Sequence, residues 1–278
     1  MEFIESLKKI TYENVEIIVV DNASDVADDI DCIARKYPDV KLVKSDQNLG
    51  FAGGNNLGIR VATGNAYLFV NNDVEFEPDF LQPLVDTLYT KPEAGMVSPK
   101  IHFYHSHKTI QYAGCDRIDS LTTRGHFIGH GVKDQGQFDE ERETSYAHGA
   151  AMLVKREVVE QAGVMPELYF LFYEELDWCN RIREAGYKIY YQPKSLVHHK
   201  ESMSVGKKSP LKTYYMTRSR MIFLKRNTSG IVYLLGMLYF LLLAIPKNIL
   251  VHIIRGEQQL MNAYFRGVGA FFNHTRLA

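Results

Sequence analysis

A short apolar run that ends in three polar residues constrains the fold of this chain more than any other feature. Residues 66–70, Ala-Tyr-Leu-Phe-Val, are followed at once by Asn71, Asn72 and Asp73. An apolar run of this length with polar boundaries is typical of a buried strand in a parallel sheet, and ligands of open α/β sheets bind just beyond the carboxyl ends of such strands. Asp and Asn oxygens suit Mg²⁺ or Mn²⁺ bridging to phosphates, so the stretch predicts a metal and phosphate site, with a plain polar turn as the alternative.

Alternating strand and helix patterns on both sides of this run predict an α/β fold. Residues 15–20 are β-branched and apolar, and they end in the polar residues 21–24. A helix over 26–36 and a strand over 40–43 follow, an alternation that predicts right-handed βαβ units and a mostly parallel sheet. The same reading predicts helices over 2–10, 78–90, 155–162 and 174–185, and strands over 96–98, 145–154 and 187–192.

Composition limits the class of protein. The chain has 278 residues, 46% of them hydrophobic and 23% charged, which is typical of a globular protein with one large domain or two small ones. The formal net charge of -1 gives no argument for nucleic acid as a partner. Cys32, Cys115 and Cys179 lie far apart, which argues against a disulfide framework or a zinc site and fits a reducing compartment. The first residues do not have the pattern of a signal peptide.

A glycine-rich loop lies between the second and third predicted strands. Residues 48–58 read Asn-Leu-Gly-Phe-Ala-Gly-Gly-Asn-Asn-Leu-Gly, and glycine allows close backbone approach or a positive φ. A helix is expected to begin within the loop, where its first amides can face a phosphate or a nucleotide. The loop lacks the Lys-Ser/Thr of a P-loop, so a nucleoside triphosphatase is not expected. An ordinary Gly/Asn turn is the other interpretation.

A cluster of acids opens the helix predicted over 174–185. Aromatic residues lead directly into Glu174, Glu175 and Asp177. The helix dipole alone favours acids in a first turn. The functional alternative is that one carboxylate, poorly solvated beside the aromatics, acts as a general base. At about 100° per residue, Glu174 and Asp177 lie near one face and Glu175 lies off it, so the three acids are not expected to be equivalent, and replacing Glu174 is expected to have a mild effect.

Two groups of histidines are candidate metal ligands. His102, His105 and His107 lie in the weakly periodic segment 100–145, where a solvated loop is the commoner explanation for histidines. A second pair stands at the end of Pro-Lys-Ser-Leu-Val-His-His-Lys, residues 193–200. A single histidine is usually structural, although imidazole is also a good ligand for Mn²⁺.

The last quarter of the chain has a different character. Residues 211–226 predict a basic amphipathic helix, and residues 227–246 contain no charged side chain. The uncharged length and its basic flanks predict association with a membrane, either spanning it or lying at its interface, with a long buried helix as the alternative. The expected division is a catalytic domain over 1–228 and a hydrophobic helical tail over 229–278.

Taken together, the ordered motifs of this chain resemble family-2 glycosyltransferases, particularly the bacterial rhamnosyltransferase-like members. The matching segments, in family order over roughly residues 2–226, are Val-Val-Asp-Asn-Ala-Ser (19–24), the glycine-rich loop (48–58), Phe-Val-Asn-Asn-Asp-Val (69–74), His-Gly-Ala-Ala-Met-Leu-Val (148–154), Tyr-Glu-Glu-Leu-Asp-Trp-Cys-Asn-Arg (173–181) with Ala-Gly-Tyr (185–187), and Val-His-His-Lys (197–200). The resemblance implies a GT-A fold, a nucleoside-diphosphate sugar donor, Mn²⁺ or Mg²⁺ as cofactor, and inversion at the sugar's anomeric carbon.

The resemblance also implies roles for single residues. Asp73 stands in the family's metal and diphosphate motif, where Asn71 replaces the usual first acid, and His199 matches the histidine that completes the metal site. Glu175 matches the catalytic base, more often Asp in the family, with Asp177 as the alternative. Arg218 or Lys208 is expected, from position and charge, to close over the diphosphate. The full set of expected donor-binding residues is Asp21, which would contact the nucleoside base, Asn22, Ser24, Asn48, Gly53, Gly54, Asn55, Asn72, Asp73, His148, Gly149 and Arg218.

The implied function is transfer of rhamnose or a similar hexose to a glycan or lipid-linked acceptor in cell-surface polysaccharide synthesis, at the cytoplasmic face of the membrane. The chain departs from the family at its start, because members usually begin with an apolar strand that this sequence lacks. The sheet is therefore expected to miss a strand beside residues 15–20, through a misassigned start or a truncated copy. Two rival functions are a catalytically impaired module that binds a nucleotide sugar or glycan, and a sugar nucleotidyltransferase.

Overall fold

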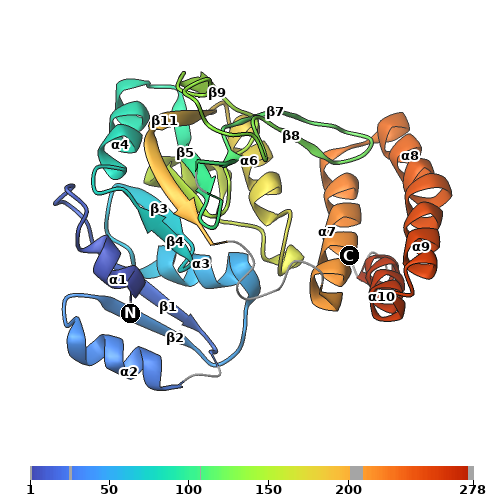
Figure 1. The fold of residues 1–278 in the computed structure, drawn as a ribbon, viewed down its shortest axis with the longest axis horizontal. Coiled ribbons are helices and arrows are strands. Elements are labelled where there is room, and N and C mark those ends of the chain that lie inside the picture. Colours follow the sequence, from blue (N-terminus) through green and yellow to red (C-terminus); the bar gives the residue numbers. More distant parts are fainter. Residues whose placement is uncertain (1, 25–26, 107, 201–208, 275–278) are drawn as a thin grey trace.

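The computed structural model describes residues 2–24, 27–106, 108–200 and 209–274. An α/β core carries a separate block of helices at its C-terminal end, and a long β-hairpin reaches from the core toward that block (Figure 1). The strands are β1 (Ile18–Asn22), β2 (Lys41–Ser45), β3 (Ala66–Val70), β4 (Val74–Phe76), β5 (Ala94–Phe103), β6 (Ile110–Tyr112), β7 (Cys115–Ile118), β8 (Gly125–Phe127), β9 (Arg142–Glu143), β10 (Ala151–Lys155) and β11 (Lys188–His199). The helices are α1 (Glu2–Leu7), α2 (Ala27–Lys36), α3 (Gly50–Val61), α4 (Leu81–Thr90), α5 (Arg156–Ala162), the 3₁₀ turn η1 (Glu167–Tyr169), α6 (Glu174–Glu184), α7 (Pro210–Asn227), α8 (Gly230–Tyr239), the π-helical turn η2 (Phe240–Ala244), α9 (Ile245–Ile254) and α10 (Gln258–His274).

The main sheet is mixed. Its strand order is β3-β10-β5-β11-β4, with β6 paired to β5 and β9 paired to β11. Within the described residues of this sheet, only β5 and β11 pair in parallel, and the other pairs are antiparallel. The expectation of a mostly parallel sheet was therefore wrong. Apolar patterning predicts where strands occur, but β10 inserts between β3 and β5 and runs opposite to both, which no local pattern reveals.

The strand predicted over 15–20 begins and ends later in the sequence, as β1, and it is not part of the main sheet. In the part of the chain that the structure describes, β1 pairs only with β2, in parallel, from Ile18 opposite Lys41 to Asn22 opposite Ser45. Helix α1 packs near β4 instead, where the rings of Phe3 and Phe76 lie 5.6 Å apart.

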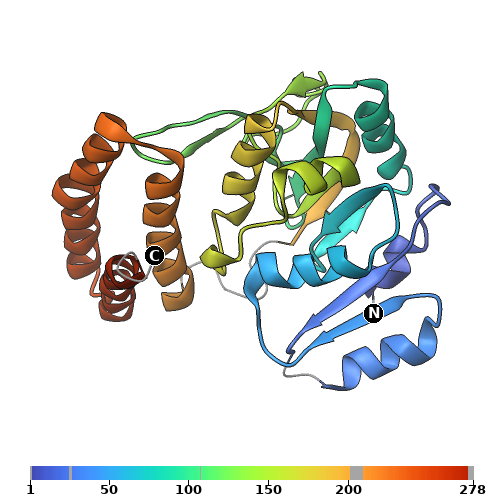
Figure 2. The same ribbon diagram turned by 180° about the vertical axis from the view of Figure 1, so that it is seen from behind.

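Helix α6 is anchored to the core beneath the end of β3. Trp178 is fully buried, and its ring meets that of Phe69 edge to face at 5.5 Å. Its indole Nε1 donates a hydrogen bond to the carbonyl of Gly163 at 2.7 Å, so the one polar atom of the side chain is satisfied. Truncating a buried Trp to Ala typically costs about 3–5 kcal/mol. Together with α3 and α5, α6 covers the face of the core that is turned toward the viewer in Figure 2.

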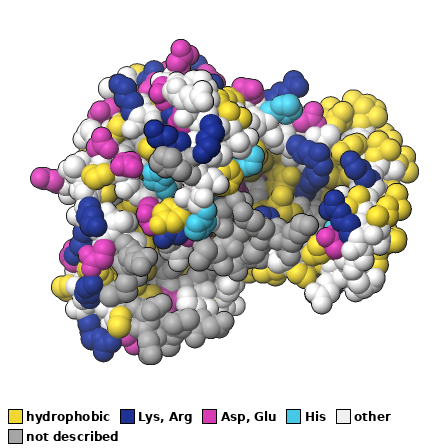
Figure 3. Space-filling model, in the orientation of Figure 1, with side chains coloured by type: hydrophobic (Ala, Val, Ile, Leu, Met, Phe, Trp, Pro, Cys, Tyr) yellow, Lys and Arg dark blue, Asp and Glu magenta, His cyan; other side chains and the backbone are white. Residues whose placement is uncertain are grey.

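The C-terminal helices form a block beside the core (Figures 1 and 2). Helix α7 packs closely on α10, where a side chain at Gly267 would bring its Cβ 2.7 Å from the carbonyl oxygen of Tyr214. Residues Gly230–Ile254 form one helix of 25 residues with mean hydropathy 2.0, by length and composition sufficient to cross a membrane. Its side chains are largely uncovered, since Leu242 is 67% and Ile254 74% exposed. Figure 3 shows hydrophobic side chains over α8 and α9 beside Lys and Arg.

Candidate active site

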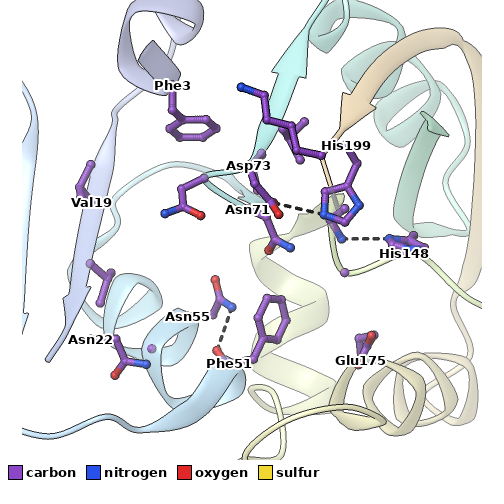
Figure 4. A pocket seen from close by; sticks show the side chains of 18 of the residues that line it. Phe3, Val19, Asn22, Phe51, Asn55, Asn71, Asp73, His148, Glu175 and His199 are labelled. Atoms are coloured by element: carbon purple, nitrogen blue, oxygen red, sulfur yellow. Dashed lines mark hydrogen bonds and ion pairs between the residues drawn. The ribbon is translucent and has the colours of Figure 1, made fainter. Parts of the chain in front are cut away.

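A cavity of about 1460 Å³ lies between β1, α3, the end of β3 and the start of α6 (Figure 4). This exceeds the roughly 300–1,000 Å³ of most small-molecule sites, so a nucleotide sugar and part of an acceptor can fit together. The predicted site residues that line it are Asp21, Asn22, Ser24, Gly54, Asn55, Asn72, Asp73, His148, Gly149, Glu175 and His199. Those that do not line it are Asn48, Gly53, Asp177 and Arg218.

Two predicted metal ligands meet at one corner of this cavity. Asp73 follows β3, and His199 is the last residue of β11. The Asp73 Oδ1 and His199 Nε2 atoms lie 3.2 Å apart. The two atoms are not aligned for a hydrogen bond, and the buried Asp73 Oδ1 has no hydrogen-bond partner among the described residues. His199 Nδ1 lies 2.9 Å from the amide oxygen of buried Gln111, which can only accept. In the neutral ring the proton therefore sits on Nδ1, and the lone pair of Nε2 faces the corner, where it can bind a cation.

The geometry of this corner fits a divalent cation whose remaining coordination positions are filled by the bound substrate and water. Two lone-pair atoms of Asp73 and His199, about 3 Å apart, have the separation of neighbouring ligands around an ion with bonds of about 2.1 Å. No group of three His, Cys, Asp or Glu residues that could hold a metal occurs in the described part of the chain. Mg²⁺ and Mn²⁺ sites with few protein ligands normally use substrate phosphates and water for the remaining positions.

His148 lies in the wall beside the metal corner, with its ring 6.0 Å from that of His199. Its Nδ1 accepts a hydrogen bond from the backbone N–H of Ala150 at 3.1 Å, which leaves the proton on Nε2. Burial, with the neighbouring His199, lowers the pKa of His148 to about 3. The ring is therefore neutral near pH 7 and can donate a hydrogen bond to a ligand.

Glu175 lines the same cavity from the first turn of α6. Its Oε1 accepts a hydrogen bond from the hydroxyl of buried Tyr146 at 3.0 Å, and its buried Oε2 has no partner among the described residues. Burial raises the pKa of Glu175 above its ordinary value, which suits a base that must take a proton near neutral pH. A side chain at Gly149 would place its Cβ 3.3 Å from Glu175 Oε1 and 3.6 Å from the ring of Phe51. The wall at Gly149 therefore approaches the carboxylate closely.

Glu174 is more involved than expected. It is only 2% exposed, it lines the cavity, and its Oε2 has no partner among the described residues. Burial and then the neighbouring Glu175 raise the pKa of Glu174 well above its ordinary value. The helix therefore begins with its first two acids at the cavity, and the expected mild effect of Glu174→Gln stays a prediction.

Asp177 points away from the cavity. It is 1% exposed, and its Oδ2 accepts hydrogen bonds from the Tyr169 hydroxyl at 2.5 Å and from Arg226 Nε at 2.8 Å. Arg181 lies 3.6 Å from its other oxygen. These partners and its position contradict the assignment of Asp177 as an alternative base. Its partner on α7 is distant in sequence, so a local pattern could not identify it.

The end of β1 and the start of α3 are joined by side-chain amides. Asn22 Oδ1 accepts from the backbone N–H of Leu49 at 2.9 Å, and its Nδ2 donates to the carbonyl of Gly50 at 2.9 Å. Asn48 Oδ1 accepts from the N–H of Gly50, also at 2.9 Å. Gly53 faces Leu49, since an added Cβ would lie 2.6 Å from the Leu49 Cβ. Asn48 and Gly53 thus shape the loop without lining the cavity, and this corrects their assignment as donor-binding residues.

The remaining predicted donor-binding residues are within the cavity wall opposite Glu175, where Figure 4 shows Val19 and Asn22. Asp21 Oδ1 accepts from the backbone N–H of Ser24 at 2.9 Å, which fixes the turn after β1. Gly54 brings the backbone of α3 close to Asn22, because an added Cβ would meet Asn22 Nδ2 at 3.1 Å. Asn55 donates from Nδ2 to the carbonyl of Phe51 at 2.9 Å.

Arg218 does not reach the cavity. Its guanidinium donates to the carbonyl oxygens of Leu168 at 2.9 Å and Tyr169 at 3.0 Å, so its expected role at the diphosphate was wrong. Lys208, the other candidate for that role, lies outside the described residues. Lys212, from the first turn of α7, is a cation that does line the cavity. The sequence analysis missed it, although Pro210 at the start of a basic helix is a usable signal.

The alternative of a metal cluster at His102, His105 and His107 finds no support among the histidines that the structure describes. His102 Nε2 lies 2.9 Å from Asp134 Oδ2, and Asp134 also accepts from Lys100 at 2.9 Å. These contacts join a surface loop to β5. His107 lies outside the described residues.

The backbone just before α6 is strained. Phe170, Phe172 and Tyr173 have φ angles of 66°, 65° and 74°, in the left-handed region that side chains other than glycine's rarely adopt. Such conformations cost on the order of 1 kcal/mol or more each and persist only where surrounding contacts hold them. The structure around residues 168–173 must therefore supply those contacts.

With this geometry established, comparison with known proteins identifies the family. The family model described as "Glycosyl transferase family 2" matches residues 1–163, more than half of the chain. The chain belongs to glycosyl transferase family 2. The expected resemblance to this family is thus confirmed.

Several known proteins are similar to this member of glycosyl transferase family 2 over much of its length. The N-acetylglucosaminyl-diphospho-decaprenol L-rhamnosyltransferase of Mycobacterium tuberculosis is 26% identical over 250 residues, covering 82% of this chain and 80% of that protein. The low-salt glycan biosynthesis hexosyltransferase Agl10 of Haloferax volcanii is 28% identical over 181 residues, covering 63% of this chain and 55% of that protein. An uncharacterised Sinorhizobium fredii protein, y4gI, is 27% identical over 230 residues, and the chain spans 25% of its length.

Solved structures show the same fold. The mannosyltransferase PcManGT of Pyrobaculum calidifontis, in complex with GDP-Man and Mn²⁺, superimposes with a TM-score of 0.59 at 14% identity, covering 98% of this chain and 82% of that one. GalNAc-T7 with UDP, GalNAc and Mn²⁺ also gives a TM-score of 0.59, at 18% identity, covering 70% of this chain and 40% of that one. The expected GT-A fold, a mixed sheet flanked by helices, is confirmed.

Proposed function

We propose that this chain is an inverting glycosyltransferase that moves rhamnose or a similar hexose from a nucleoside-diphosphate donor to a glycan or lipid-linked acceptor. One observation carries the proposal: three side chains with suitable chemistry line the same cavity (Figure 4). Asp73 and His199 lie close enough to bind one cation together, and Glu175 is a buried carboxylate. A single displacement needs a leaving-group site and a base together. Membership of glycosyl transferase family 2 supports the same reaction class.

The proposed chemistry is a direct displacement at the anomeric carbon. The acceptor oxygen bonds to that carbon while the bond from carbon to the diphosphate oxygen breaks, and the acceptor's proton passes to Glu175. The Tyr146 hydroxyl, 3.0 Å from Glu175 Oε1, holds the carboxylate in place. Asp73 and His199 would hold Mn²⁺ or Mg²⁺, which supplies charge stabilisation to the departing diphosphate. Neutral His148 would donate a hydrogen bond from Nε2 to the donor.

The names of relatives guide the choice of donor and acceptor. One match is a dTDP-rhamnosyl transferase of Shigella flexneri, 23% identical over 234 residues, and the M. tuberculosis relative is named for a diphospho-decaprenol acceptor. We therefore infer a dTDP-rhamnose-like donor, a polyprenyl-diphosphate-linked acceptor and a role in cell-surface polysaccharide synthesis.

The exposed apolar helix supports a location at the cytoplasmic face of the membrane, as a peripheral or single-pass protein. Its uncovered leucines lie next to the basic end of α7, which favours contact with an anionic lipid surface. Removing residues 229–278 should release the chain from membranes. Fractionation of the full chain as a soluble protein without detergent would contradict this location.

The test of function is a donor screen with the purified full chain. dTDP-rhamnose, UDP-N-acetylglucosamine and GDP-mannose should be compared, each with Mn²⁺, Mg²⁺ or a chelator. Metal-dependent transfer or slow hydrolysis of one donor supports the proposal. Donor binding without turnover would instead favour the impaired binding module. Pyrophosphate formation from a nucleoside triphosphate and a sugar phosphate would favour a nucleotidyltransferase.

A further inference from the structure

The segment that leads into the proposed base is held by a helix distant in sequence. Residues 168–173 connect η1 to α6, and the left-handed residues Phe170, Phe172 and Tyr173 place Glu174 and Glu175 at the cavity. Tyr173 is the residue directly before α6, so its backbone angles set the direction in which the first turn of the helix begins. A backbone in this conformation relaxes unless its carbonyls and side chains are restrained from outside.

Two neighbouring residues of α7 provide that restraint. Arg218 donates from its two terminal nitrogens to the carbonyls of Leu168 and Tyr169, at 2.9 and 3.0 Å. The single hydroxyl proton of fully buried Ser219 is shared between the carbonyl oxygens of Leu171, at 2.9 Å, and Tyr169, at 3.3 Å. Three carbonyls of the strained segment therefore depend on this one dipeptide.

A fourth carbonyl of the segment, that of Phe170, is held from the opposite side. The backbone N–H of Phe51 donates to the carbonyl of Phe170 at 2.8 Å, and Gly50 comes so close that an added Cβ would lie 2.1 Å from the same oxygen. The ring of Phe170 stacks on Tyr215 of α7 at 4.9 Å. The segment is thus held between the start of α3 and the face of α7.

We propose that Arg218 and Ser219 are positioning residues for Glu175, and that α7 clamps residues 168–173 so that the carboxylate stays beside Tyr146. The role of Glu175 as the base in this inference rests on the proposed function. Arg218 acts as a fork that bridges two consecutive carbonyls, which a single ammonium group cannot reproduce. Ser219 is fully buried although it lies between two arginines, and the buried apolar residues Met221, Ile222, Phe223 and Leu224 follow it.

The clamp predicts a change in pH dependence when it is loosened. The charged or titratable groups that interact with Glu175 are Glu174 and Cys179 on α6, Tyr173 before it, and Tyr146 before β10. Burial is the first cause of the raised pKa of Glu175, so water admitted by a looser segment lowers that pKa. The base must be ionised, and activity is lost as pH falls through its pKa. The acid limb of kcat should therefore move to lower pH in the variants.

The experiment compares Arg218→Gln, Arg218→Lys and Ser219→Ala with two matched controls on the same helix. Lys225→Gln removes one exposed positive charge about two turns further along α7. Thr213→Ala removes a hydroxyl whose hydrogen bond is to the carbonyl of Ser209, the N-cap of the same helix. Transfer from dTDP-rhamnose with Mn²⁺ gives kcat, KM and the pH profile. Amide hydrogen exchange of residues 168–176 gives a reading that needs no turnover.

We expect kcat to fall on the order of a hundredfold in Arg218→Gln, the loss typical of a catalytic group displaced by about 1 Å, while KM for the donor changes little. Ser219→Ala should lose less, and Arg218→Lys should lie between Arg218→Gln and the original chain. Exchange over 168–176 should quicken at least about tenfold in Arg218→Gln and Ser219→Ala but not in the controls.

Two results would overturn the clamp. Unchanged exchange over 168–176 in both Arg218→Gln and Ser219→Ala would show that α7 does not restrain the segment. A fall in kcat that the Lys225 and Thr213 controls share would show a general loss of stability. If no nucleotide sugar is turned over by the original chain, the proposed function fails, and the exchange measurement still decides the restraint.

Discussion

The two walls of the cavity differ in how deeply their residues are buried. On one side β10, between β3 and β5, is buried at each of its five residues, and Trp178 anchors α6 beneath it. On the other side every residue of β1 keeps partial exposure, and β1 pairs only with β2 within the described residues. The metal pair and the proposed base belong to the buried wall, and Asn22 belongs to the exposed one.

This difference separates two tasks. Groups that act in a reaction need fixed positions, which a packed and fully paired sheet provides. Groups that recognise a nucleotide tolerate a wall that opens locally, because few buried contacts hold it. Changes to the buried wall should therefore lower the rate of transfer, and changes at β1 should lower affinity. Each prediction below tests one part of that separation.

The largest effect is expected at the metal corner. Asp73→Ala removes the only acid of residues 71–73 and should abolish metal-dependent binding of dTDP-rhamnose. Calorimetry with Mn²⁺ and with a chelator measures this directly. Asp79→Ala, an exposed acid outside the cavity, is the control. Equal donor affinity with metal and with chelator, matching that of the original chain in Mn²⁺, would contradict the assignment of Asp73 as a ligand.

The next effect is expected at the base. Glu175→Gln should lower transfer by at least about a hundredfold at saturating donor, the scale of a lost general base, while donor affinity is kept. Because burial raises the pKa of Glu175, transfer by the original chain should decline below neutral pH, as the carboxylate gains its proton. Glu184→Gln, at the exposed far end of α6, is the control. An active Glu175→Gln chain with an inactive Glu174→Gln chain would move the role to Glu174.

The sequence alone could predict much of the site but little of its support. Asp73 and Glu175 stand at a strand end and a helix start that the patterns predict, whereas His199 ends a strand that runs beyond the predicted 187–192 and was assigned from the family resemblance. A helical wheel also separated Glu175 from Asp177. It could not predict that Glu174 shares the cavity with Glu175, because the left-handed Tyr173 sets how the helix begins. The antiparallel β10 and the partners of Arg218 and Asp177 depend on contacts distant in sequence.

A smaller effect, on stability, is expected at Asp177. Asp177→Asn keeps an oxygen for the Tyr169 hydroxyl but loses the charge that faces Arg226. Hydrogen bonds to charged groups contribute about 1.5–3 kcal/mol, so the free energy of unfolding should fall by about 2 kcal/mol. Denaturant unfolding of this variant, of Arg226→Gln and of the double variant gives the pairwise term. Transfer should fall far less than in Glu175→Gln; a comparable loss of transfer would show that Asp177 acts in the reaction.

The smallest effect is expected at Asn22, on the exposed wall. Its amide joins the end of β1 to the loop at Leu49 and Gly50, and Asn22→Ala removes both hydrogen bonds. Because each such bond contributes about 1 kcal/mol and part of the loop is open to water, donor affinity should fall by about tenfold or less. The rate at saturating donor should stay within about twofold, since neither Glu175 nor Asp73 is moved. Ser45→Ala, which removes a hydroxyl bonded to the Gln47 carbonyl at the end of β2, is the control. A fall in the saturated rate that approaches the loss in Glu175→Gln would show that the exposed wall also fixes the reacting groups. In that case the separation between a wall for recognition and a wall for chemistry would be wrong.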